Sequence, residues 1–175
     1  MKICFVHRRP FGFLPDLLEY AEELANLGHQ ITFVGPSGNE AESTLVKVVN
    51  LNFESTNSFL ISVKSFLRSK NFDIIHVFHF RGVWKLAYKR AVRAKYVIDV
   101  RTLHVSDAKG RVSKISFLKD RLTWIESLFF DDVLALTSKI KKRMSPHWKP
   151  VKMVPLGATR ISFSKEDVLK HRKDI

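Results

Sequence analysis

The chain has 175 residues and a hydrophobic fraction of 45%, which suits one globular domain with a sizeable core. Cys4 is the only cysteine, so an internal disulfide is excluded, and no apolar run approaches the ~18 residues that a membrane-spanning helix requires. The net charge of +13 is uneven, because residues 1–75 carry 7 Lys/Arg against 8 Asp/Glu whereas residues 76–175 carry 23 against 9.

Strand-like and helix-like segments alternate along the chain. Runs of β-branched and aromatic residues predict strands, and apolar residues at helical spacing predict helices. The strands are expected at residues 2–7, 30–35, 45–51, 73–78, 95–100, 133–137 and 151–154. The helices are expected at residues 15–27, 57–70, 82–94 and 115–130, with a further short helix that begins at Ser138.

Two of these helices carry clear local signals. The first begins at Pro15, a residue favoured in the first helical turn, and Gly28 supplies its end. The helix at 115–130 has an apolar face that consists of Leu118, Leu122, Ile125, Leu128 and Phe129.

The alternation of strands and helices predicts an α/β fold with a mostly parallel sheet and helices on both faces. Ligands of such sheets bind beyond the carboxyl ends of the strands. The loops that follow His7, Phe78, Val100 and Thr137 are therefore the candidate positions for a functional site.

The first of these loops contains Gly12 between Phe11 and Phe13, but it has no G-x-G-x-x-G pattern and no Walker lysine. A dinucleotide site needs close approach of the backbone to the pyrophosphate at several glycines. Neither a dinucleotide-binding function nor a P-loop function is expected.

Two histidines stand at the end of the strand at 73–78. His76 lies inside the apolar run and is interpreted as a core histidine. His79 lies just past the strand end, where an imidazole can bond a substrate hydroxyl and exchange a proton, with a surface or structural role as the alternative. Residues three apart on a strand point to opposite faces, so the pair does not predict a zinc site.

The ends of the next two strands offer groups that bind anions. Asp99 lies in an apolar run and needs a partner, while the planar fork of Arg101 suits a phosphate or sugar hydroxyls. A structural pairing of Asp99 with Arg101 is an equal alternative. Ser138 is predicted to cap the short helix, and a capped helix N-terminus also binds phosphate.

Several segments, in this order and spacing, make the chain similar to the N-terminal GT-B domain of glycosyltransferase family 4. They are residues 2–6 (KICFV), 24–34 (LANLGHQITFV), 73–76 (DIIH), 98–101 (IDVR), 136–138 (LTS) and 154–157 (VPLG). The resemblance implies a Rossmann-like three-layer sandwich. It also implies a retaining sugar transfer from a nucleotide-sugar, with the acceptor held mainly by this domain and the donor mainly by a second domain.

The resemblance also implies roles for individual residues. His79 is the expected catalytic residue, and the expected substrate-binding residues are Phe11, Gly12, Arg101, Thr102, Ser138 and Gly157. Phe78 stands where the family commonly has a histidine, the first loop lacks the family's paired glycines, and residues 155–159 depart from its Pro-Asn-Gly-Val-Asp stretch. Neither a metal nor a cofactor is expected.

The expected organisation is an acceptor-binding domain at residues 1–160 and, at residues 161–175, the start of a linker toward a missing C-terminal donor domain. Such a chain would bind a nucleotide-sugar only together with that domain, and would be inactive alone. The basic second part suits a sugar or lipid-linked acceptor and peripheral contact with an anionic membrane, on its cytoplasmic face because one cysteine fits a reducing compartment.

Two other classes of function compete with this interpretation. A stand-alone basic α/β module would bind anionic lipid or nucleic acid, but no nucleic-acid motif is present, so nucleic acid is not the expected partner. A complete small α/β enzyme would need a nucleophile and a base, yet the sequence contains neither a G-x-S-x-G elbow nor a Cys/His pair.

Overall fold

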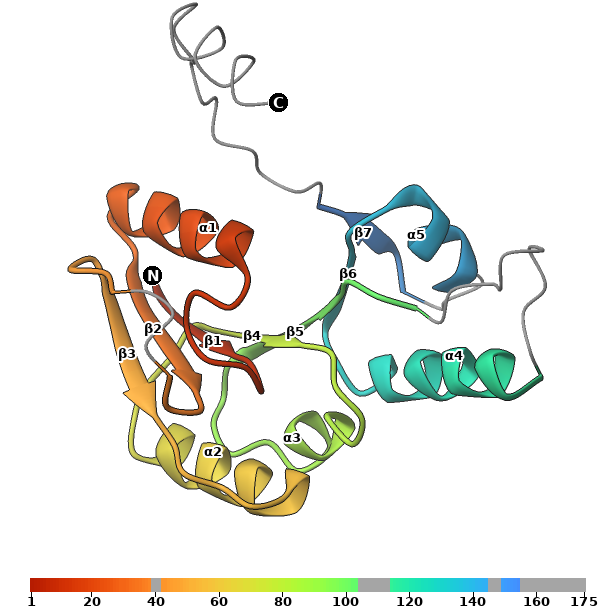
Figure 1. The fold of residues 1–175 in the computed structure, drawn as a ribbon, viewed down its shortest axis with the longest axis horizontal. Helices are drawn as coiled ribbons and strands as arrows, with labels where there is room; N and C mark the ends of the chain where they lie inside the picture. The colour runs from red at the N-terminus through yellow and green to blue at the C-terminus, as the bar shows by residue number, and fades with distance from the viewer. Residues whose placement is uncertain (39–41, 104–113, 145–148, 155–175) are drawn as a thin grey trace, which may run out of the picture.

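The computed structural model describes residues 1–38, 42–103, 114–144 and 149–154. Within these residues, seven strands form one sheet in the order β3-β2-β1-β4-β5-β6-β7, and every neighbouring pair is parallel (Figure 1). The strands are β1 (Lys2–Val6), β2 (Gln30–Gly35), β3 (Val46–Asn50), β4 (Ile74–Phe78), β5 (Lys95–Val100), β6 (Asp132–Ala135) and β7 (Val151–Met153). The predicted sheet is thus confirmed, and it is parallel throughout.

Five helices connect these strands within the described residues. They are α1 (Pro15–Asn26), α2 (Thr56–Arg68), α3 (Trp84–Tyr88), α4 (Lys114–Ser127) and α5 (Ser138–Met144). Figure 1 shows α1 on the opposite side of the sheet from α2 and α3. The fold therefore has three layers, as the sequence predicts.

Each face of the sheet has its own apolar core. On one face, Leu17 and Ala21 of α1 pack with Phe5 and Phe33. On the other face, side chains of α2, α3 and α5 pack on Tyr96 and Ile98 of β5. The helix residues of this core include Phe59, Val63, Leu86, Ile140 and Met144. Burial of these side chains on both faces explains why the strands read as continuous apolar runs.

The boundaries of α1 follow from the two residues that the sequence singles out. Pro15 is the first helical residue, where its missing N–H costs nothing. Gly28 has φ +84°, and its N–H donates to the carbonyl of Ala25 at 2.9 Å. A positive φ of this size is the conformation that ends helices at glycine.

Helix α3 is much shorter than the predicted helix at 82–94. After Tyr88 the chain leaves the helical path, and Arg90 donates to Asp131 at 2.8 Å while its guanidinium lies 5.1 Å from the ring centroid of Tyr96. These contacts join the segment that follows α3 to β5 and to the residue before β6. They are long-range in sequence, so helical periodicity did not reveal them.

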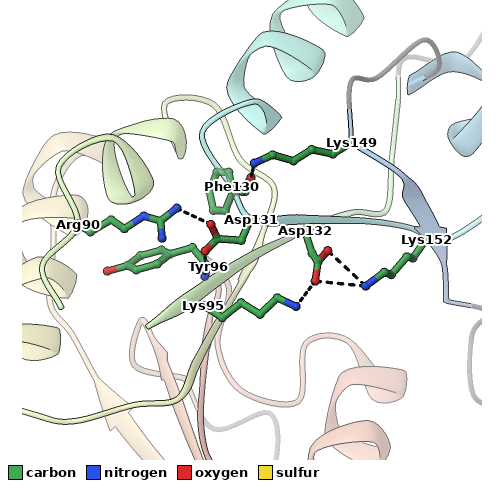
Figure 2. A network of polar contacts seen from close by, with 8 residues as sticks. All are labelled: Arg90, Lys95, Tyr96, Phe130, Asp131, Asp132, Lys149 and Lys152. Carbon is green, nitrogen blue, oxygen red and sulfur yellow. Dashed lines mark hydrogen bonds and ion pairs between the residues drawn. The ribbon is translucent and has the colours of Figure 1, made fainter. Parts of the chain in front are cut away.

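Figure 2 shows how basic residues are neutralised where β5, β6 and β7 begin. Asp131 also accepts from the backbone N–H of Tyr96 at 2.8 Å. Asp132 pairs with Lys95 at 2.5 Å and with Lys152 at 3.3 Å. These contacts hold the pKa of Asp132 below its usual value, chiefly through the hydrogen bond from Lys95.

The orientation of α4 differs from the one that its apolar face suggests. Leu118, Leu122 and Ile125 are 60%, 38% and 45% exposed, whereas Thr123 and Glu126 are each 5% exposed. Polar side chains thus face the interior along this helix. The reason is a set of hydrogen bonds around Glu126.

Candidate functional site

The carboxyl ends of four adjacent strands lie side by side. The register pairs Val6 with Val77, Val77 with Ile98, and Ile98 with Val133. Residues that follow these strands therefore meet along one edge of the sheet. This edge is where the sequence predicts the functional site.

Arg101, at the end of β5, lies between two carboxylates. Its Nε donates to Asp99 at 3.0 Å, and its Nη1 donates to Asp16 in the first turn of α1. The guanidinium carbon also lies 4.7 Å from the ring centroid of Phe78. Two of its three nitrogens are therefore used within the fold, and the pairing with Asp99 that the sequence left open is present.

Asp99 is buried, and it has two cationic or polar neighbours. Its Oδ2 lies 3.4 Å from Nε2 of His76, which is itself 5% exposed. Burial alone would raise the pKa of Asp99, but the hydrogen bond and charge of His76, together with Arg101, hold the pKa below its usual value. The interpretation of His76 as a core histidine is confirmed.

His79 is partly buried and points toward α4. Its Nε2 lies 3.0 Å from Oε2 of Glu126, and the side chain of His79 is 17% exposed. The other oxygen of Glu126 accepts from the backbone N–H of Gly82 at 2.8 Å. One carboxylate thus fixes both His79 and the loop between β4 and α3, and sequence reasoning did not identify it.

The first loop divides into buried and open parts. Phe11 is 1% exposed, and its ring packs 5.1 Å from that of Phe33, so this predicted substrate-binding residue belongs to the core. Gly12 has φ +85°. The guanidinium of Arg8 lies 5.7 Å from the ring of Phe80, and its Nε makes no hydrogen bond within the described residues.

His7, the residue that follows β1, is held neutral. Burial, followed by the charge of Arg101, lowers the pKa of His7 from 6.5 to about 4. Its ring packs against Phe78 at 5.1 Å in an edge-on arrangement. The Nδ1 of this neutral imidazole is buried and makes no hydrogen bond within the described residues.

A cavity of about 240 Å³ lies between the ends of β5 and β6. Among the described residues, its lining consists of Arg101, Thr102, Leu103, Thr137, Lys139, Ile140 and Arg143. Three of these side chains are cationic and none is acidic. Cations and hydroxyls of this kind bind a phosphate or carboxylate on a polar ligand.

A second hollow, of about 450 Å³, has a different character. It lies beside β3 and is lined by Phe11, Gly38, Glu42, Ser43, Thr44, Val46, Val48 and Asn50. Among the described residues that line it, the one charged side chain, Glu42, is acidic. An anionic ligand therefore fits the smaller cavity between β5 and β6 better.

The remaining predicted residues are distributed unevenly around this site. Thr102 lines the cavity. Ser138 is the first residue of α5, and the capping bond comes from Thr137, whose Oγ1 accepts from the N–H of Ile140 at 3.2 Å. The predicted cap is therefore one residue too late. Gly157 lies outside the described residues, as does the expected linker at 161–175.

Lys139 and Arg143, which were not among the expected site residues, both line the cavity. Their spacing of four residues on one helix was the available signal. Arg143 also contacts Asp120 of α4 at 3.3 Å.

Among the described residues, no helix has both the length and the apolar character needed to span a bilayer.

A family model described as Glycosyltransferase Family 4 matches residues 17–158. The crystal structure of WaaG, a glycosyltransferase involved in lipopolysaccharide biosynthesis, matches at 15% identity and TM-score 0.64, over 98% of this chain and 51% of WaaG. Sucrose-phosphate synthase from Thermosynechococcus elongatus matches at 9% identity and TM-score 0.56, over 99% of this chain and 96% of that one. Apo UGT2 of Phytolacca americana matches at 12% identity and TM-score 0.59, over 98% of this chain and 55% of UGT2.

No curated protein sequence matches the chain significantly. The chain spans about half the length of WaaG and of UGT2. At these identities, the structural likeness shows a shared fold.

Proposed function

Because the chain belongs to glycosyltransferase family 4 and has the fold of one Rossmann-like half of a GT-B enzyme, we propose that it is the acceptor-binding half of a retaining glycosyltransferase. The complete enzyme transfers a sugar from a nucleotide-sugar that is held mainly by a second domain. This chain alone binds the acceptor and does not complete the reaction.

The observation that carries this proposal is the cationic cavity between β5 and β6. Its described lining residues include Arg101, Lys139 and Arg143 as well as Thr102 and Thr137. Hydroxyl groups suit a sugar, and three cations suit a phosphate or carboxylate attached to it. We therefore propose an anionic acceptor, such as a lipid-linked sugar phosphate, presented at the cytoplasmic face of a membrane.

His79 is the proposed catalytic residue, and Glu126 positions it. The bond between Nε2 and Glu126 orients the imidazole, and within the described part of the chain Nδ1 makes no hydrogen bond. An imidazole held in this way can exchange a proton with an acceptor hydroxyl. Gly12, Ser138 and Gly157 stay proposed substrate contacts, whereas Phe11 supports the loop from within the core.

Deletion of the gene in its host, followed by mass spectrometry of glycolipids and glycans, tests this function. The deletion is expected to shorten at least one glycan by a sugar residue. The wild-type gene should restore the sugar, and a Lys139→Ala/Arg143→Ala gene should restore it poorly. A Lys141→Ala/Lys142→Ala gene is the matched control, because neither lysine lines the cavity. An unchanged glycan profile would contradict the proposal.

A further inference from the structure

A hollow of about 220 Å³ lies at the amino ends of β1, β2 and β3. Its lining includes three lysines, Lys2, Lys47 and Lys70, and two aromatic residues, Phe66 and Phe72. The cavity between β5 and β6 lies at the carboxyl ends of the strands and shares no described lining residue with this hollow. At ~3.3 Å per residue, the length of β1 alone separates the two ends of the sheet by about 13 Å. The hollow is therefore a separate feature of the fold.

The sheet positions at this hollow are polar, although they belong to the face that α2 covers. Cys4, Val34 and Val49 pack in the same core as side chains of α2, and residues two apart on a strand share a face. By this alternation, the polar residues on that face are Lys2, Gln30, Thr32 and Lys47. The register places them in two adjacent pairs. Strands of a parallel sheet that is covered on both faces are usually apolar, so this polar group is not required by the fold.

The three lysines have no anionic partner within the described residues. None of their ammonium groups forms an ion pair or a hydrogen bond there, and no acidic residue is among the described lining. Asp73, the residue after Phe72, accepts instead from the backbone N–H of Lys2 at 2.7 Å. Like charges that line one small space repel each other, and a bound anion removes this repulsion.

Neither the edge of the sheet nor the end of α2 accounts for all three lysines. Lys47 lies on β3, the first strand in the sheet order, where a lysine discourages pairing with another chain. β1 lies between β2 and β4, so protection of an edge does not explain Lys2. At the end of α2, the carbonyls of Phe66 and Leu67 already accept from backbone N–H groups, so they do not need the ammonium of Lys70 as a donor.

Phe66 and Phe72 add an apolar part to the lining. Both are partly buried, and their ring centroids lie 6.0 Å apart. The half-buried Thr32 also lines the hollow, and its hydroxyl makes no hydrogen bond within the described part of the chain. Apolar walls with a few polar groups are typical of small-molecule sites. Liquid water takes about 30 Å³ per molecule, so a hollow of this volume has room for a small organic compound.

We propose that this hollow binds a small organic phosphate that carries an aromatic ring. The phosphate is held by Lys2, Lys47 and Lys70, and the ring packs against Phe66 and Phe72. Lysine is a common phosphate ligand, and aromatic rings pair favourably with one another. The site does not depend on the proposed function, because its described lining is distinct from that of the cavity between β5 and β6.

Phenyl phosphate is the probe that tests this site. Inorganic phosphate lacks its ring, and benzyl alcohol lacks its charge. The ¹⁵N-labelled chain is titrated with each compound in about 150 mM salt, which screens distant charges. Phenyl phosphate is expected to shift the amide signals of Thr32, Lys47 and Lys70. At these residues, each of the other two compounds should bind about tenfold more weakly.

A Lys47→Ala/Lys70→Ala variant should bind phenyl phosphate about tenfold more weakly, with its other amide signals unchanged. Arg68→Ala/Lys142→Ala is the matched control, because it removes the same charge from two exposed residues that do not line the hollow. It should bind like wild type. An equal loss in the control would show a general attraction to basic surface and would overturn the inference.

Two further results would also overturn it. One is phenyl phosphate binding no tighter than inorganic phosphate, and the other is shifts confined to residues away from the hollow. The glycan assay is independent of this titration, so a failure of the phosphate site and a failure of the transferase assignment are told apart.

Discussion

Arg101 and Asp16 lie 85 positions apart in the sequence, and their ion pair ties the carboxyl end of β5 to the first turn of α1. The same guanidinium holds Asp99 at 3.0 Å. Because Arg101 also lines the cationic cavity, one side chain supports the fold and faces the proposed acceptor.

Arg101→Ala should therefore reduce stability as well as binding. Asp99 is buried, and removing its cation leaves a charge with weaker compensation, so a loss of about 2–4 kcal/mol in the free energy of unfolding is expected. Asp16→Asn removes one ion pair, keeps Arg101 at the cavity and should cost about 1 kcal/mol. Urea unfolding measures both values. An equal loss in the free energy of unfolding for Arg101→Ala and Asp16→Asn would show that the buried charge of Asp99 does not need Arg101 for compensation.

Glu126 is expected to stabilise the loop between β4 and α3, because it accepts a hydrogen bond from Gly82. Glu126→Ala leaves the N–H of Gly82 without its acceptor and should cost about 2–3 kcal/mol. Glu126→Gln keeps a carbonyl for that bond and should cost less. Thermal unfolding distinguishes the two, and amide hydrogen exchange at Gly82 should accelerate more in the alanine variant. Similar unfolding and exchange for both variants would contradict the positioning role.

His7 makes stability depend on pH in a defined window. Its pKa falls from 6.5 to about 4 on folding, so between these values the unfolded chain binds more protons and stability rises with pH. His7 should contribute a loss of about 2 kcal/mol on acidification from near pH 7 to near pH 5. The lowered pKa of Asp99 makes stability depend on pH only below its usual value of 3.8, which lies outside this window.

Urea unfolding of wild type and of His7→Gln at both pH values isolates this contribution. The variant lacks the titrating imidazole, so its stability should change less on acidification. Equal losses in the two proteins would show that His7 titrates normally in the folded chain.

Gly28 provides a test of the helix end. Its φ of +84° disfavours a β-carbon, although no atom lies within 4 Å of the position that the carbon would occupy. Gly28→Ala should therefore cost about 1 kcal/mol through backbone strain alone. Gly28→Asn should cost less, because asparagine adopts positive φ more readily. Equal losses for both variants in urea unfolding would point to a cause other than the backbone.

The sheet was predictable from sequence because local patterns determine it. Apolar runs, helical periodicity, Pro15 and Gly28 locate most elements without tertiary information. The length of α3 and the rotation of α4 were not predictable, since each depends on a bond between residues more than 40 positions apart. These bonds are Arg90 to Asp131 and Gly82 to Glu126.

The candidate site was predictable only in part for the same reason. The pairing of Asp99 with Arg101 was one of two alternatives that their places at a strand end offered, whereas the contact of His76 with Asp99 was not predicted. Asp16 reaches the site from α1, so no local pattern connects it with Arg101. The family resemblance implied substrate binding by Phe11, but its ring is buried in the core cluster that includes Leu17 and Ala21 of α1.

We propose that the cavity between β5 and β6 recognises the anionic part of a sugar acceptor. The most direct measurement is a titration of the ¹⁵N-labelled chain with glucose 1-phosphate, followed by NMR, with glucose as the uncharged comparison. Chemical-shift changes are expected at Thr102, Thr137 and Ile140 with glucose 1-phosphate and not with glucose. The affinity for glucose 1-phosphate should fall about tenfold in Lys139→Ala and stay unchanged in Lys142→Ala. Shifts confined to other residues, or equal affinity in the Lys139→Ala chain, would contradict it.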